Sequence, residues 1–506
     1  MSDTSYDLLT DRLLRVREPA GTTVMQSLAT TLTRLSRGDE IEFCALQAHQ
    51  EHAWHAFLVQ IAAIVLHRES APSPFEDDDM WRDALRDLAG GPAAWCLLVP
   101  DLSLPAFLQP PVPEGTLADF KRNESWDDLE LLATAKNHDV KRDRIRRPAP
   151  DHYVYLLVAL QTMQGAYGLG MYGTARMKSG YGNRPCVAFA PGLGRAERFL
   201  RDVRACLAGR ATAVEHIGYA LTNGIALTWT LPCDGVASIA FDRLDPWFVD
   251  SCRRVRLVEK DGRIVAHRRS TTVRRVAHGD KTGHTADPWT PVDRVNGTAL
   301  TVSAAGFGYD RTQELLLGGQ FAMGAAGTIR PDDGLAPWFL ASAMARGQGG
   351  TDGIHERLVP VPAPVRALLR STGGRDRLRD RSKRWVESAK TAKLKVLGPA
   401  LSVLVGKGDG TKEARGRILS AMDKEIDRIF FERLWETAEA DDVEADAAWA
   451  QNLVDLARRQ LAEAIGAAPT RAASRYRVIS DAENLLEGCA RKRFPVAFHD
   501  VPRRSS

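Results

Sequence analysis

Three prolines within five residues mark the point at which the pattern of this chain changes. Pro360, Pro362 and Pro364 lie in the segment LVPVPAPV, residues 358–365. Proline fixes φ and cannot donate a backbone hydrogen bond, so such a cluster is typical of a linker or hinge. We therefore predict a mixed α/β domain over residues 1–357, a proline-rich linker over 358–365 and a helical domain over 366–506.

The residues after the linker show helical periodicity. Apolar side chains recur at spacings of three and four, which places them on one face of a helix: Leu419, Met422, Ile426, Ile429, Phe430 and Leu434. Helices are predicted over residues 367–397, 414–438, 445–465 and 472–492. We expect them to form an antiparallel four-helix bundle.

The first part of the chain mixes element types. Residues 41–67 carry apolar side chains at helical spacing and predict a buried helix, and residues 153–163 predict a compact apolar helix or strand. Short β-like runs occupy residues 225–231, 236–241, 255–258, 264–267 and 299–303. Strands and helices do not alternate regularly. The predicted fold class is therefore α+β, a large mixed N-terminal domain followed by the helical bundle.

Composition describes an ordinary globular protein. The chain has 506 residues, of which 44% are hydrophobic and 26% charged, and its net charge of +4 decides little about partners. The seven cysteines include no CxxC pair, which predicts reduced thiols in a cytoplasmic protein and no cysteine-based zinc site. The N-terminus lacks the apolar core of a signal peptide. The longest apolar run, residues 58–66, is well short of the roughly 20 residues of a membrane span.

Residues 161–185 form a glycine-rich segment that also holds aromatic and cationic side chains. Its sequence is QTMQGAYGLGMYGTARMKSGYGNRP, with the three cations Arg176, Lys178 and Arg184. Glycine lets a backbone approach another polymer closely, cations pair with phosphates, and aromatic rings stack on bases. This combination favours a nucleic-acid contact. The alternative is a surface loop whose glycines serve only tight packing.

The same segment contains a possible cofactor motif. Gly168, Gly170 and Gly173 match GxGxxG, the fingerprint of a dinucleotide-binding site. That fingerprint requires a preceding strand, a following helix and an acidic residue about 20 residues later, and the sequence offers no convincing βαβ context. A nucleotide-cofactor enzyme using residues 168–173 is the rival hypothesis to nucleic-acid binding. Our preferred hypothesis involves no cofactor.

A basic run precedes the glycine segment. Residues 136–147, KNHDVKRDRIRR, hold six cations and two acids. Within it, Lys136, Asn137, His138, Lys141 and Arg142 are suited to contact phosphates and base edges. A solvated helix face is the alternative for any such run. Further basic tracts at residues 253–275 and 366–395 indicate a long polyanion that crosses more than one domain.

A second glycine and aromatic element spans residues 306–313, GFGYDRTQ. We predict a hairpin tip, with Gly308 permitting the turn and Arg311, Thr312 and Gln313 at or beyond it. A polar side chain on such a tip can be driven into a duplex to separate its strands. The alternative is a plain β-turn.

No motif in the chain requires an enzyme. His49, His52 and His55 lack the HExxH spacing of helical zinc enzymes and are expected to be ordinary, partly exposed histidines. The chain has no G-x-S-x-G elbow. We predict a protein without catalytic residues.

Taken in order, these segments resemble one family, the large subunit (CasA) of Cascade, the type I-E CRISPR surveillance complex. The resemblance is carried by LLTDRLLRVR at residues 8–17, Phe107-Leu108-Gln109, AKNHDVKR at 135–142, MKSGYGNRPCV at 177–187 and GYDRTQ at 308–313, followed by the final helices. The resemblance extends nearly from end to end, and it departs from some relatives in having no cysteine zinc cluster.

The resemblance implies a DNA-recognition subunit. Lys136, Asn137, His138, Lys141 and Arg142, with Gly168, Gly170, Gly173 and Lys178, would read the PAM (the short motif beside the target) in double-stranded DNA. Gln313, with Thr312 and Arg311, would act as a wedge that starts unwinding. Partners would be the guide-RNA-containing Cascade subunits (backbone, small and 5′-handle-binding) and the nuclease-helicase effector, with no membrane partner. Guide-RNA pairing would supply sequence specificity.

Overall fold

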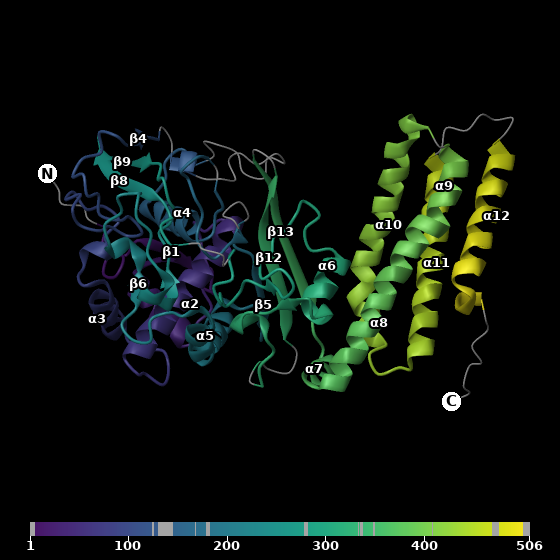
Figure 1. Ribbon diagram of the computed structural model, residues 1–506, viewed down its shortest axis with the longest axis horizontal. Helices are drawn as coiled ribbons and strands as arrows, with labels where there is room; N and C mark the ends of the chain where they lie inside the picture. The colour runs from purple at the N-terminus through teal and green to yellow at the C-terminus, as the bar shows by residue number, and fades with distance from the viewer. Residues whose placement is uncertain are drawn as a thin grey trace. The chain divides into compact units, whose positions relative to one another are not determined.

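The chain folds into two compact units that interleave in sequence. In the computed structural model, one unit comprises Met1–Phe307 and Gln320–Pro360, and the other comprises Gly308–Gly319 and Val361–Ser506. The structure describes residues 6–123, 126–129, 145–166, 168–178, 183–277, 282–331, 333, 337–347, 350–406, 408–467 and 475–498. Figure 1 shows the elements along the chain.

Small sheets and helices build the first unit around a large apolar core, beside which a smaller cluster forms around Tyr219 and Phe248. β5 (Cys186–Ala190) pairs antiparallel with β12 (Trp338–Gly347), which pairs with β13 (Gly350–Pro360). A second sheet has the order β4 (Lys121–Arg122), β9 (Arg263–Arg269), β8 (Arg254–Lys260). The remaining strands are β1 (Leu14–Arg17), β2 (Thr23–Gln26), β3 (Glu42–Phe43), β6 (Ile225–Leu227), β7 (Leu244–Val249), β10 (Val292–Asp293) and β11 (Phe321–Ala322).

The helices of the first unit surround the most apolar segments. α2 (Glu51–Arg68) and α4 (Pro150–Thr162) are buried on nearly all sides, as their continuous apolar sequences require. α5 (Arg195–Ile217) packs against α2, and a remote carboxylate caps its start, because Glu40 accepts from the backbone N–H groups of Arg195 (2.7 Å) and Ala196 (3.1 Å). The other helices are α1 (Leu28–Ser36) and α3 (Asp78–Ala89).

The second unit consists mainly of long helices. Its elements are α7 (Ala363–Arg370), α8 (Thr372–Thr391), a π-helical turn at Ala392–Leu397, α9 (Gly398–Val405), α10 (Asp409–Glu436), α11 (Asp442–Ala467) and α12 (Arg475–Arg493). Met422, Ile426, Phe430 and Leu434 are fully buried, so the predicted apolar face of α10 packs inward. The prediction of an α+β fold with C-terminal helices is confirmed.

The proline-rich segment is not a free linker. β13 continues to Pro360, and α7 begins at Ala363 with Pro362 as its N-cap residue. Proline is compatible with both positions, since the end of a strand and the start of a helix need no donor from it. The structure differs from the predicted boundaries in a second respect, because Gly308–Gly319 groups with the helices rather than with the first unit.

The predicted hairpin at residues 306–313 is wrong in its secondary structure. Tyr309–Gln313 forms α6, and a π-helical turn follows over Glu314–Gly318. Gly308, in extended conformation (φ −61°, ψ 168°), is the N-cap residue of this helix rather than the pivot of a turn. The turn residues were misjudged because the three leucines after Gln313, Leu315–Leu317, supply a buried helical face.

Candidate nucleic-acid interface

The predicted DNA-binding residues fall into two groups. Lys136, Asn137, His138, Lys141 and Arg142 lie outside the described residues, so their role stays a prediction. The structure describes Gly168, Gly170, Gly173 and Lys178 in the first unit, and Arg311, Thr312 and Gln313 in the second.

The glycine segment is fastened at both sides of a short turn. Asn183 accepts a hydrogen bond from the N–H of Gly165 (2.6 Å), and the N–H of Met171 closes a turn onto the carbonyl of Gly168 (3.1 Å). Leu169, at the tip of this turn, is 96% exposed. The segment therefore presents a fixed, solvent-facing tip.

Packing requires a glycine at two of the three predicted positions and not at the third. Gly170 has a φ of +71°, and a Cβ there would lie 2.6 Å from both the Cβ of Ser270 and the carbonyl oxygen of Thr271. A Cβ on Gly173 would lie 2.5 Å from the sulfur of Met177. Both positions are buried, so packing accounts for these two glycines. Gly168 is exposed, and a Cβ there would meet no atom within 4 Å.

Segment 270–275 supports the glycine turn and was not singled out residue by residue from the sequence. Thr271 donates from its backbone N–H (2.9 Å) and its hydroxyl (3.2 Å) to the carbonyl of Gly170. The guanidinium of Arg274 lies 5.4 Å from the ring centre of Tyr172. The sequence did show a basic tract at residues 253–275. Which of its residues contact the glycine turn is decided by the fold and could not be predicted from that tract.

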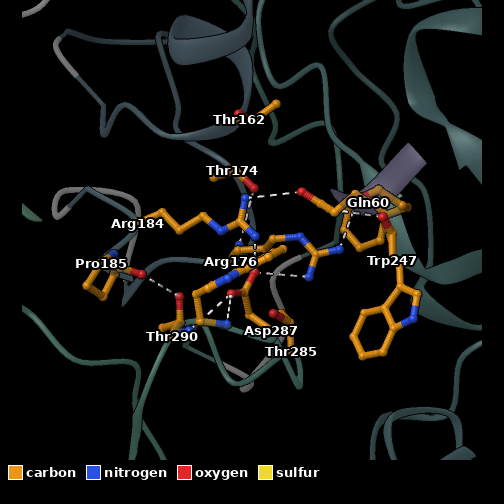
Figure 2. A network of polar contacts seen from close by, with 12 residues as sticks. Gln60, Thr162, Thr174, Arg176, Arg184, Pro185, Trp247, Thr285, Asp287 and Thr290 are labelled. Carbon is orange, nitrogen blue, oxygen red and sulfur yellow. Dashed lines mark hydrogen bonds and ion pairs between the residues drawn. The ribbon is translucent and has the colours of Figure 1, made fainter. Parts of the chain in front are cut away.

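Two of the three cations in the segment are not available to a ligand. Arg176 and Arg184 are 1% and 2% exposed and share the carboxylate of Asp287, at 3.3 and 2.7 Å respectively. Figure 2 shows both guanidiniums converging on this side chain. The expectation that they serve phosphates is wrong, because both guanidiniums are buried in the core and already paired with Asp287.

The same cluster is completed by aromatic rings and backbone groups. Arg176 lies 4.2 Å from the ring centre of Phe248 and donates to its carbonyl (2.9 Å). The other carboxylate oxygen of Asp287 accepts from the N–H groups of Trp289 (3.0 Å) and Thr290 (3.1 Å). Burial favours the protonated carboxyl, but Arg184 and Arg176 outweigh it and hold the pKa of Asp287 below its usual range.

Lys178 differs from these arginines. Its side chain is half-buried, and no ion pair to it occurs among the acidic residues that the structure describes. Its backbone packs against Gly283, where a Cβ would lie 2.9 Å from the N of Lys178. The backbone of Lys178 is therefore held in place by packing, and its ammonium group is not neutralised by any acidic side chain among the described residues.

The wedge residues lie in α6 and the turn that follows it. Gln313 is 5% exposed, and its amide donates to the hydroxyl of Ser382 on α8 (2.9 Å). Thr312 is fully buried, and Arg311 forms an ion pair with Glu314 (2.6 Å). In this arrangement Gln313 does not project into solvent.

The context of the GxGxxG motif does not fit a dinucleotide site. The helix α4, not a strand, ends at Thr162 before the motif, and residues 171–177, in its second half and directly after it, are not helical. The phosphate-binding helix that the fingerprint supplies is therefore missing from the described residues around it.

Two of the three histidines, His52 and His55, are partly exposed as expected, whereas His49 is buried. His55 lies 2.9 Å from the carboxylate of Asp202, which also accepts from the indole of Trp289 (2.9 Å). Burial, helped by Arg198, lowers the pKa of His55, and burial lowers that of His52 further. Among the described residues, no group of three or more histidine, cysteine or carboxylate side chains is arranged to hold a metal ion.

Solved structures share this architecture over its whole length. Cse1 from Acidimicrobium ferrooxidans, a CRISPR-associated protein, matches with a TM-score of 0.65 and 15% identity, over 98% of this chain and 99% of its own. Thermobifida fusca Cse1 matches with a TM-score of 0.65 and 18% identity, over 99% and 100%. Thermus thermophilus CasA matches with a TM-score of 0.63 and 15% identity, over 97% and 100%.

The chain therefore has the fold of Cse1 and CasA proteins, and the predicted resemblance to the CasA large-subunit family is confirmed at the level of fold. No protein-family model and no curated protein sequence matches the chain. No helix in the described parts of the chain is long and apolar enough to cross a membrane.

Proposed function

We propose that this chain is the large subunit of a type I-E CRISPR surveillance complex and that it recognises the PAM in double-stranded DNA. One observation carries the proposal: the fold matches Cse1 structures over 98% or more of both chains, including the C-terminal helices. A match that spans two interleaved units argues against a shared fragment. The role is non-enzymatic and cytoplasmic, and guide-RNA pairing provides the sequence specificity.

The glycine turn and the basic run before it are the proposed PAM-reading elements. The exposed tip at Gly168 and Leu169 supports contact with a duplex at this position, as does the charge of Lys178, which pairs with no acidic side chain in the described part of the chain. Gly170 and Gly173 act indirectly, since they allow the turn to pack on its support. Lys136, Asn137, His138, Lys141 and Arg142 complete the surface as phosphate and base contacts.

Gln313 remains the proposed wedge, but its side chain must first be released from its present position. Its side chain is held by Ser382, so α6 must release it before it can enter a duplex. The helix continues directly into a π-helical turn, and such turns occur frequently at functional sites. Arg311, which is more exposed, and Thr312 would flank the inserted amide.

The proposed partners are duplex DNA, the guide-RNA-containing backbone, small and 5′-handle-binding subunits, and the nuclease-helicase effector. The decisive experiment is co-expression of the chain with the companion subunits and guide RNA from the same genome. We expect co-purification of one complex and R-loop formation on a target that carries a suitable PAM. A complex that assembles and opens targets equally well without this chain would refute the proposal.

A matched pair of variants tests the wedge. Gln313→Ala should slow R-loop formation more than it weakens initial DNA capture. Ser382→Ala removes the same hydrogen bond but keeps the glutamine, so it should leave the R-loop rate unchanged or raise it. Equal slowing by both variants would show that the bond matters for structure and that Gln313 does not act on DNA.

A further inference from the structure

The face of the β4–β9–β8 sheet gathers positive charge without neutralising it. Lys260 stands directly opposite Arg263 across the hairpin, and Arg122 stands opposite His267. Alternation along β9 puts Arg263 and His267 on one face of the sheet. Lys260, Arg263 and Arg122 are exposed, and no acidic side chain among the described residues pairs with any of them.

Opposed like charges destabilise a sheet, so this arrangement works against the fold. The acids nearby do not relieve it. Glu259 alternates to the opposite face, and Asp261 lies in the two-residue turn, where it and Gly262 have φ values of +52° and +69°. By contrast, Arg254 and Arg269 at the other end of the hairpin both pair with Glu114, and Arg269 also pairs with Asp119. Among the described residues of this face, Lys260, Arg263 and Arg122 therefore stay without an acidic partner.

The pKa of His267 is lowered by burial and by the positive charge around it. Burial lowers its pKa, and Arg122 and Lys260 lower it further by repelling the imidazolium. Arg122 and Lys260, which come from different strands, therefore both act on this side chain.

The hairpin is also continuous with the glycine turn. β9 ends at Arg269, and Thr271 two residues later is bonded to Gly170. From that contact to Arg263 the extended chain covers about 25 Å, at ~3.3 Å per residue. Duplex DNA carries a phosphate on each strand about every 3.4 Å, so the span corresponds to roughly seven base pairs.

We propose that Lys260, Arg263 and Arg122 form a second phosphate-binding surface that follows the backbone of the duplex flanking the site contacted by the glycine turn. This inference rests on the proposed function for its ligand. The spacing and the continuity with the turn favour a linear polyanion, and duplex DNA is the polyanion that the glycine turn would already hold. The contact is independent of base sequence, because phosphates carry no sequence information.

The first test measures salt dependence on the full chain. A fluorescent 30-base-pair duplex is titrated at several NaCl concentrations with wild type, with Lys260→Gln/Arg263→Gln, and with Arg12→Gln/Arg243→Gln, a control that removes two exposed arginines elsewhere in the same unit. Each lost phosphate contact should reduce the slope of log K against log salt by about 0.9. We expect a reduction of roughly 1.8 for the hairpin variant and none beyond experimental error for the control.

A second readout separates contact from general electrostatics. Binding of duplex DNA should raise the pKa of His267, measured by NMR, because phosphates replace repulsion with attraction. In the assembled complex, trimming the flanking duplex below roughly seven base pairs should make the hairpin variant and wild type bind equally.

The possible outcomes are distinct. A wild-type salt slope in the hairpin variant overturns the inference. The inference is also overturned if the hairpin variant binds an RNA stem-loop more weakly than wild type but binds duplex DNA equally well, which would assign the surface to RNA. If the variant binds DNA normally but no longer assembles with the companion subunits, the inference is overturned as well, and the surface is assigned to protein. If the complex forms no R-loops while the salt slope still depends on the hairpin, the proposed function fails and the phosphate surface stands.

Discussion

Asp287 is the shared counter-ion of two buried arginines in the first unit, and Asp287→Asn tests how much its charge stabilises the fold. The substitution keeps the size of the side chain and leaves an oxygen to accept from the N–H groups of Trp289 and Thr290. It removes the negative charge that Arg176 and Arg184 share at 3.3 and 2.7 Å. Two buried guanidiniums then lose their common counter-ion.

The expected loss is large. Removing one partner of a buried ion pair costs about 3–5 kcal/mol, because the remaining charge stays desolvated. A domain is stable by only about 5–15 kcal/mol, so the variant should lose a substantial part of its free energy of unfolding. The matched control is Glu42→Gln, which breaks the pair between Arg17 and Glu42 at 3.2 Å on the surface. Exposed pairs contribute about 0–1 kcal/mol.

Urea unfolding followed by tryptophan fluorescence provides the assay, since Trp289 lies beside the cluster. We expect a clearly lower midpoint for Asp287→Asn than for Glu42→Gln. Adding Arg176→Met and Arg184→Met to Asp287→Asn should recover part of the loss, because the uncompensated cations are gone. Equal midpoints for the two single variants, or no recovery in the triple variant, would refute the interpretation that charge balance stabilises this core.

Three further outcomes follow from the same geometry. Gly170→Ala should destabilise the first unit by about 1–2 kcal/mol or more, because of its positive φ and the contact with Thr271. The control Gly168→Ala should change stability by less than about 1 kcal/mol. Comparable urea midpoints for the two variants would show that packing does not require a glycine at position 170. Lys178→Gln should reduce the salt slope of duplex binding by about 0.9 without changing stability, and an unchanged slope would exclude a phosphate contact. His52 and His55 have lowered pKa values in the folded state, so the unfolded chain binds protons first as pH falls below about 6.5, and stability should decline from there toward the folded pKa values; a midpoint in urea that stays constant between pH 7.5 and 5.5 would contradict this.

The spacing of apolar residues along the sequence was sufficient to predict the C-terminal helices. Met422, Ile426 and Phe430 recur at a spacing that only a helix places on one side, and all three are buried. The two strands of the β8–β9 hairpin were also predicted, as the β-like runs at residues 255–258 and 264–267, but their pairing was not.

Long-range pairing was not visible. Arg176 looked like a surface cation because nothing near it in sequence announces Asp287, 111 residues away. The strands β12 and β13 were missed, since their apolar residues are spread among small and polar ones and their pairing with β5 is a property of the fold. Gln313 was assigned to a turn because Gly308 was read as a pivot, whereas the leucines after it extend a helix.

The position of Gly308–Gly319 also has a consequence for synthesis. This segment packs with α8 and α10, which the ribosome makes later. Tyr309, Leu315 and Leu317 therefore leave the ribosome without the surfaces that cover them. At about 5–20 residues per second, the ~120 residues from the end of the segment to the end of α10 take roughly 6–24 s to translate. During that interval the nascent chain exposes an apolar segment in its middle, which makes it a target for chaperones and a point where slow translation favours aggregation.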